Sequence, residues 1–161
     1  MSESELAKLY TRYGYVVFRR CLAYLGDPEA AQRAVEDVFL RVVRGWEAFS
    51  TQPEPHRWLC RCADELCLAE LRRNRADTGA DHAHDIEVAI ANDDAAALAS
   101  MRKLVRELDP ETFRLAVLYF MDELTEAELA QELGVSRRKV AKREQLLLQR
   151  ARQLLEAESV T

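Results

Sequence analysis

The side chains with the clearest chemistry are basic residues near the C-terminus. From Ser136 to Arg152 the chain holds seven lysine or arginine residues and one acidic residue, Glu144. Such a run favours contact with phosphate groups, and basic side chains also donate hydrogen bonds to base edges in a DNA groove. The alternative is a solvated helix face that happens to be basic. The basic side chains that we expect to contact DNA here are Arg137, Arg138, Lys139, Lys142 and Arg143.

Histidine and cysteine residues form a second, weaker constellation. His56, Cys60 and Cys67 share one face of a predicted helix, and Cys62 lies nearby. A His-x3-Cys spacing on a helix is able to bind zinc, but small cysteines also fill helical cores. We favour core packing and expect no metal and no other cofactor. The sequence contains no phosphate-binding loop, nucleophile elbow or metalloprotease motif, so an enzyme is not expected.

Two helices are predicted to position the C-terminal basic residues. Thr125 and Glu128 have the spacing of a capping box at a helix start. Gly134 suits the left-handed conformation of a tight turn, and Ser136 is a good cap for the helix that follows. Residues 125–143, TEAELAQELGVSRRKVAKR, therefore predict a helix-turn-helix whose second helix is offered to a major groove.

The rest of the chain also has the apolar periodicity of helices. Apolar residues at steps of three and four predict helices over residues 4–24, 28–49 and 55–75, then one centred on Leu104 and one capped by Asp109. No segment alternates with a period of two for long enough to form a sheet. The fold class is therefore predicted to be all-α.

Charge divides the 161 residues into three parts. The net charge is -5, yet residues 76–100 alone carry six acidic side chains and no lysine or arginine. We interpret this stretch as an acidic linker between two small helical domains, residues 1–75 and 101–161. No apolar run reaches the ~18 residues needed to span a membrane, and the acidic N-terminus does not look like a signal peptide. A cytoplasmic protein with reduced cysteines and no membrane insertion is expected.

Both predicted domains resemble a known family. The segments LYTRYGYVVFRRCLAYLGDPEAAQRAVEDVFLRVVRGWEAF and HRWLCRCADELCLAELRRNR, together with residues 101–156, resemble a bacterial RNA polymerase sigma factor of the two-domain extracytoplasmic-function (ECF) type. The resemblance implies a protein that binds core RNA polymerase, directs it to promoter DNA and helps to melt the −10 element, without a catalytic site. An anti-sigma factor or another regulatory protein is a further candidate partner.

The resemblance also implies roles for particular residues. Residues 50–56 and the helix from Arg61 to Arg73, which includes Arg72, correspond to the part that contacts the −10 strand. In the last helix Arg137, Arg138, Ala141 and Lys142 match the positions that read the −35 element. The residues that match the polymerase-docking stretch of the second helix are Glu36, Asp37, Phe39, Leu40 and Arg41.

Some positions depart from the family pattern. Arg33 stands where an acidic residue is usual, and Glu36 stands where a glutamine is usual. Asp64 and Glu65 replace the usual Arg-Asn pair of the third helix, and two carboxylates facing a DNA strand are expected to repel it. An ECF-type sigma factor is the leading hypothesis. The alternative is a sigma-like protein that no longer initiates transcription and serves as a DNA-binding or protein-binding regulator or adaptor.

Overall fold

The chain divides into two compact units, Met1–Leu98 and Ala99–Thr161, each of which is described by itself. The computed structural model describes residues 1–78 and 107–159, and all regular structure within these ranges is helical. This confirms the predicted all-α class. Most of the predicted linker and the helix centred on Leu104 lie outside the described residues. Within the described ranges, no helix has both the length and the apolar character needed to cross a membrane.

The first unit contains four helices in the described residues, and local caps set their ends. They are α1 (Glu3–Leu25), α2 (Pro28–Arg44), α3 (Trp46–Ser50) and α4 (Pro55–Thr78). Gly26 ends α1 in the left-handed conformation with φ 68°, and the Asp27 carboxylate then caps α2. The single helix predicted over residues 28–49 is wrong in this detail, because the backbone of Gly45 leaves helical geometry and separates α2 from α3.

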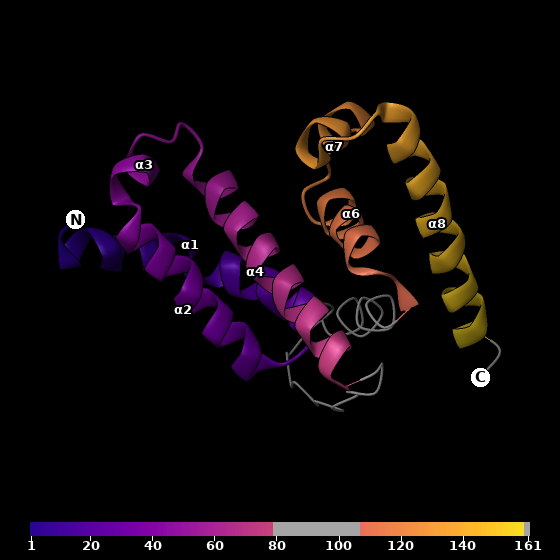
Figure 1. Ribbon diagram of the computed structural model, residues 1–161, viewed down its shortest axis with the longest axis horizontal. Helices are drawn as coiled ribbons and strands as arrows, with labels where there is room; N and C mark the ends of the chain where they lie inside the picture. Colours follow the sequence, from indigo (N-terminus) through magenta and orange to yellow (C-terminus); the bar gives the residue numbers. More distant parts are fainter. Residues whose placement is uncertain (79–106, 160–161) are drawn as a thin grey trace. The chain divides into compact units, whose positions relative to one another are not determined.

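Helices α1, α2 and α4 pack pairwise around one core, as Figure 1 shows. Tyr13 and His56 meet across α1 and α4, and so do Arg20 and Asp64 further along, so these two helices run in the same direction. The side chains that are no more than 1% exposed here include Val17, Cys21, Tyr24, Ala31, Val35, Val38, Val42, Leu59, Ala63, Cys67 and, as a polar member, Asp64.

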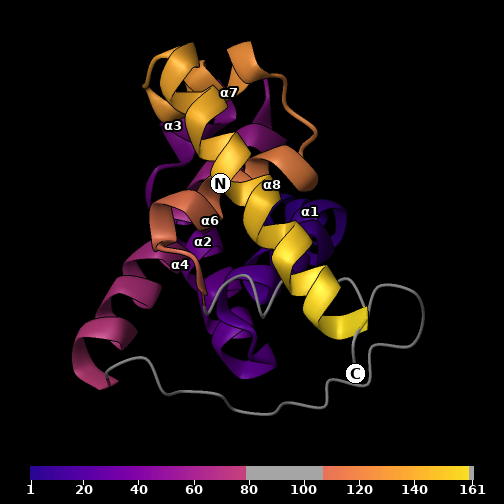
Figure 2. The ribbon, with the colours of Figure 1, turned by 90° about the vertical axis from the view of Figure 1, so that its right-hand side faces the viewer.

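The second unit is built from α6 (Pro110–Phe120), α7 (Glu126–Leu133) and α8 (Arg137–Ser159) in the described residues. The Asp109 carboxylate caps α6 as predicted, accepting a hydrogen bond from the Thr112 amide at 2.9 Å. Short helices α6 and α7 both pack against α8, which is a long helix (Figure 2). The fully buried side chains include Leu115, Val117, Leu129, Val140 and Leu147.

Candidate nucleic-acid interface

The turn between α7 and α8 is fixed by local hydrogen bonds. The Thr125 amide donates to the Glu128 carboxylate at 2.8 Å, and the Glu128 amide donates to the Thr125 hydroxyl at 3.3 Å, which confirms the predicted capping box. Gly134 adopts φ 65°, as predicted, and the Ser136 hydroxyl accepts from the Lys139 amide at 3.2 Å. These bonds set the direction in which α8 leaves the turn.

The outer face of α8 is polar and basic where the helix starts. Val140 and Leu147 are fully buried and point into the unit. A helix turns about 100° per residue, so Arg138, Lys142 and Gln145 lie on the opposite side, and all three are exposed. The sequence interpretation did not single out Gln145. The signal available in the sequence was its position three residues after Lys142, on the same helical face. A glutamine amide in that position donates and accepts hydrogen bonds at base edges.

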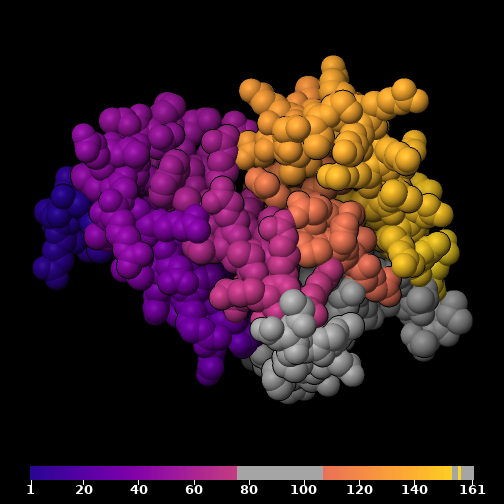
Figure 3. Space-filling view, viewed as in Figure 1, coloured from indigo at the N-terminus to yellow at the C-terminus, as the bar shows by residue number. Residues whose placement is uncertain are grey.

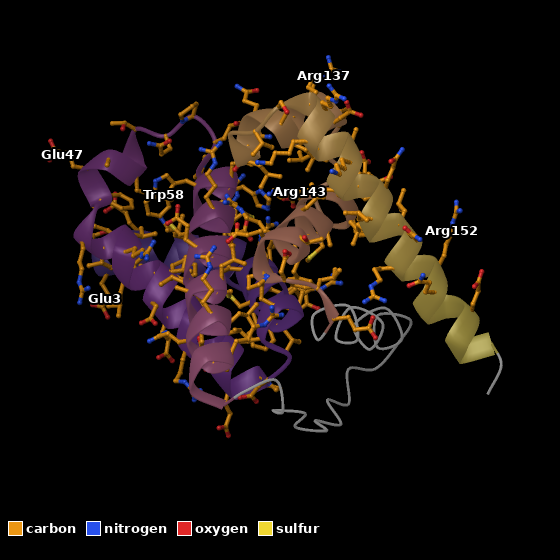
Figure 4. All side chains as sticks on the ribbon, turned by 45° about the vertical axis from the view of Figure 1, so that its right-hand side comes forward. Glu3, Glu47, Trp58, Arg137, Arg143 and Arg152 are labelled. Carbon is orange, nitrogen blue, oxygen red and sulfur yellow. The ribbon has the colours of Figure 1, made fainter. Side chains whose placement is uncertain are left out.

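The other predicted basic residues of α8 flank this outer face. Arg137 is exposed and its Nε lies 3.9 Å from the Glu126 carboxylate of α7. Lys139 is exposed, whereas Arg143 is half-buried and borders the packed side. Figure 4 shows Arg137 and Arg152 projecting from α8, and the space-filling view shows side chains standing out from this orange and yellow part of the surface (Figure 3). Arg138 and Lys142 are therefore the centre of the basic surface.

Asp64 does not face outward, and the expectation that it opposes a DNA strand is wrong. Its side chain is 1% exposed and forms a bidentate ion pair with Arg20 of α1. Arg20 Nε donates to Oδ1 at 2.6 Å, and Nη2 donates to Oδ2 at 2.9 Å. A buried carboxylate requires such a partner, because an unpaired charge inside a protein is very costly. The signal for a buried ion pair that the sequence offered was Arg20 itself, which stands within the apolar stripe of the first helix.

Glu65 is exposed but is held by a partner on a neighbouring helix. Its carboxylate accepts a hydrogen bond from Arg41 of α2 at 3.1 Å. An exposed pair contributes little free energy, yet it keeps the carboxylate next to a cation. The predicted DNA-binding residues of α4, Arg61, Arg72 and Arg73, are all exposed. The outer side of α4 therefore carries more positive than negative charge.

Aromatic rings support the loop that leads into α4. Phe49 is 4% exposed and lies between the rings of Trp46 and Trp58, with centroids 5.9 and 5.1 Å away. At the start of α4 the His56 ring lies 6.2 Å from the ring of Tyr13 on α1. The loop between α3 and α4 is thus anchored at both ends by packed rings.

The outward side of α2 combines charged and apolar side chains. Glu36, Asp37, Leu40 and Arg41 are exposed, as a docking surface requires. Phe39 needs correction: its side chain is 6% exposed and packs on the Tyr10 ring at 5.0 Å, so it supports this face from inside. Val43, which is not among the docking residues named from the sequence, is 41% exposed and lies one turn after Leu40.

The cysteines lie in the core of the first unit. The Cys60 sulfur lies 3.9 Å from His56 Nε2. Cys67 meets Cys21 of α1 instead, and a hydrogen bond with that thiol together with burial raises the pKa of Cys67. Burial likewise raises the pKa of Cys62. Within residues 1–78 and 107–159, no group of three or more histidine, cysteine or acidic side chains is arranged to hold a metal ion.

Comparison with known families matches both units. Residues 9–76 match the family model for Sigma-70 region 2. Residues 64–159 match the family model for ECF sigma factor, which covers more than half of the chain. No curated protein matches the sequence.

Proposed function

Because the chain belongs to the ECF sigma factors, a family of transcription initiation, we propose that it binds core RNA polymerase and directs it to promoter DNA. The observation that carries the proposal is the basic outer face of α8, centred on Arg138 and Lys142, at the end of a turn fixed by its own hydrogen bonds. This face lies within the region matched by the ECF sigma factor model.

We assign recognition of the −35 element to the start of α8. The N-terminal residues of a recognition helix contact base edges in the major groove. Arg138 has a planar guanidinium that pairs with the O6 and N7 atoms of guanine, and Lys142 extends the same face by one turn. Ala141 has no hydrogen-bonding side chain, so Gln145 replaces it as the third polar group of this face. Arg137, Lys139 and Arg143 are assigned to phosphates at its edges.

We assign contact with the −10 strand to the loop before α4 and to Arg61, Arg72 and Arg73. Exposed guanidinium groups attract the phosphates of the strand. The internal pairing of Asp64 supports this assignment, because its charge is compensated by Arg20 and does not meet the strand. Glu65 is bonded to Arg41, which reduces its repulsion. The departures in α4 therefore give little reason to prefer a regulator that no longer initiates transcription.

We assign polymerase docking to the outward side of α2. Its exposed apolar pair, Leu40 and Val43, is bordered by Glu36, Asp37 and Arg41, and an apolar centre with a charged rim is typical of protein interfaces. An anti-sigma factor or another regulatory protein that covered this surface would compete with the polymerase.

The experiment combines polymerase binding with DNA binding. We expect the full-length chain to co-elute with core RNA polymerase at moderate salt, and the complex to select a −35 element from a promoter pool. Arg138→Ala is expected to lower affinity for the selected duplex about 5- to 150-fold, with a much smaller effect on random duplex, as for a base contact worth ~1–3 kcal/mol.

The matched control is Arg150→Ala. Arg150 lies farther along α8, donates to Gln153 at 3.2 Å and lies 3.8 Å from Glu107. We expect this variant to weaken selected and random duplexes by one small, equal factor. Equal losses on both duplexes for Arg138→Ala would remove it from base reading. Failure of the full-length protein to bind core polymerase, or of the complex to bind any promoter, would contradict the proposed function itself.

A further inference from the structure

The Tyr10 ring of α1 adjoins the apolar residues on the outward side of α2. Its side chain is 44% exposed, and its ring centroid lies 5.0 Å from that of Phe39, which is almost fully buried. On α2, Phe39 directly precedes Leu40 and lies one turn before Val43, and both of these side chains are exposed. Tyr10, Leu40 and Val43 therefore form one apolar surface around the Phe39 ring, here named the α1–α2 patch.

Three groups hold the Tyr10 ring in one position. Phe39 packs on the ring, and Gln32 of α2 donates a hydrogen bond from Nε2 to the Tyr10 hydroxyl at 3.4 Å. The third group is the backbone of Gly14. A Cβ placed on Gly14 would have three Tyr10 ring atoms as its nearest neighbours, at 3.3, 3.4 and 3.5 Å. The ring thus lies over α1 in the space that a side chain at position 14 would take.

The stability of α1 by itself does not account for Gly14, which lies in the middle of this 23-residue helix. An interior glycine destabilises a helix relative to alanine. The glycines with positive φ in the described residues are Gly26 and Gly134, so Gly14 provides no backbone conformation that alanine lacks. It provides room for the Tyr10 ring. The helix therefore loses stability to place a ring that stays nearly half exposed, which indicates that the ring contacts a partner.

We propose that the polymerase-docking surface extends from α2 onto α1, where Tyr10 contacts core RNA polymerase and Gly14 positions its ring. The inference rests on the proposed function, which assigns docking to Leu40 and Val43, the other members of the α1–α2 patch. Tyrosine is among the residue types that carry most of the binding energy in protein interfaces, because it combines a large apolar ring with a hydroxyl. A ring that is already fixed by its neighbours also loses little conformational freedom when the partner binds.

The surroundings of Tyr10 favour a protein partner over promoter DNA. The groups that hold the ring, Phe39, Gln32 and Gly14, are uncharged, whereas surfaces that bind single strands combine aromatic rings with a basic track. Glu36 lies one helical turn from both Gln32 and Leu40, and its carboxylate would repel a DNA strand. Apolar side chains with a charged neighbour at their edge are typical of a protein interface.

The test measures two quantities for each full-length variant. The affinity for core RNA polymerase is obtained by competition with labelled wild type, and the urea midpoint of the first unit by tryptophan fluorescence. We expect Tyr10→Ala to weaken polymerase binding about 10- to 100-fold. Tyr10→Leu, which keeps apolar contact with Phe39, repeats the measurement if Tyr10→Ala does not fold. The matched control is Tyr15→Ala, expected to leave affinity unchanged, because Tyr15 is 67% exposed on the same helix but lies about 140° around its axis from Tyr10.

Gly14→Ala separates docking from a purely structural role. Its methyl group would displace the Tyr10 ring, which is exposed enough to move, while alanine favours the helix. We expect this variant to keep or raise the urea midpoint and yet to weaken polymerase binding about two- to tenfold. In a Tyr10→Ala background the same change is expected to leave affinity unaltered, because the ring on which it acts is gone.

The outcomes for Tyr10 and for the proposed function are distinguishable. Equal polymerase affinity of wild type, Tyr10→Ala and Tyr10→Leu would overturn the inference and leave the proposed function intact, as would an equal loss in Tyr15→Ala. Unchanged polymerase affinity with a loss of self-association or of oligonucleotide binding in Tyr10→Ala would assign the patch to a second copy or to DNA instead. A Gly14→Ala effect that persists without Tyr10 would remove Gly14 from ring positioning. If the wild type itself fails to bind core polymerase, the proposed function and the inference fail together.

Discussion

Removal of one member of the buried Arg20–Asp64 ion pair is expected to destabilise the first unit severely. Both side chains are at most 3% exposed, and two hydrogen bonds of 2.6 and 2.9 Å join them. Asp64→Ala leaves a buried guanidinium without its carboxylate, and Arg20→Met leaves a buried carboxylate without its guanidinium. Either change costs about 3–5 kcal/mol of stability. At roughly 0.05–0.15 kcal/mol per residue, the residues of the first unit that the structure describes correspond to a total stability of only ~4–12 kcal/mol. Each single variant therefore loses a large part of it.

The double variant Arg20→Met/Asp64→Leu is expected to be far more stable than either single variant. It removes both charges together and fills the space with apolar atoms, and buried pairs replaced in this way often cost little or even stabilise. The exposed pair is the matched control. The side chains of Arg41 and Glu65 are 43% and 61% exposed. Glu65→Gln removes the charge that pairs with Arg41 and should cost less than about 1 kcal/mol of stability.

Tryptophan fluorescence during urea unfolding measures these changes in the first unit alone. Both tryptophans of the chain, Trp46 and Trp58, lie there, in α3 and α4. With an m-value of roughly 1–1.5 kcal/mol/M, the single variants are expected to lower the urea midpoint by about 2–5 M. A shift for Asp64→Ala no larger than that of Glu65→Gln would refute the reasoning. A double variant as unstable as the singles would show that lost packing, not an unpaired charge, causes the cost.

Two further predictions concern alkaline pH and the turn before α8. Burial, assisted by the nearby Asp64 carboxylate, raises the pKa of Tyr24 well above its ordinary 10.0, so above about pH 10 the unfolded chain binds fewer protons than the folded one. The urea midpoint of the first unit is therefore expected to fall as the pH rises from about 10 to 11. Tyr24→Phe should flatten this fall, and an unchanged profile would contradict the reasoning. Gly134→Ala meets no atom within 4 Å but forces an alanine to φ 65°, which costs ~1–2 kcal/mol. The temperature of its thermal transition, followed by circular dichroism, should drop by several degrees, and that of Gly134→Asn should drop less. Equal stability of the wild type and both variants would argue against left-handed strain.

The local signals in the sequence predicted the helices and their ends well. The capping box of Thr125 and Glu128, the left-handed Gly134 and the Asp109 cap all involve residues no more than four apart. Their hydrogen bonds form within one helical turn and need no distant partner. The all-α class follows from apolar periodicity in the same way. The break at Gly45 was missed, since one glycine inside an apolar pattern does not reveal whether the helix ends there.

Contacts between helices were decided only by the tertiary structure. Asp64 and Arg20 are 44 residues apart, and the sequence indicated two acids on a surface where the structure places one of them in the core. The prediction that Phe39 lies on the docking face is wrong for a similar reason, because Phe39 packs on Tyr10 of another helix. The rotation of a helix about its axis and its register against its neighbours depend on the packing of the whole unit. Periodicity alone therefore predicts that a helix has a buried side, but packing decides which borderline residues belong to it.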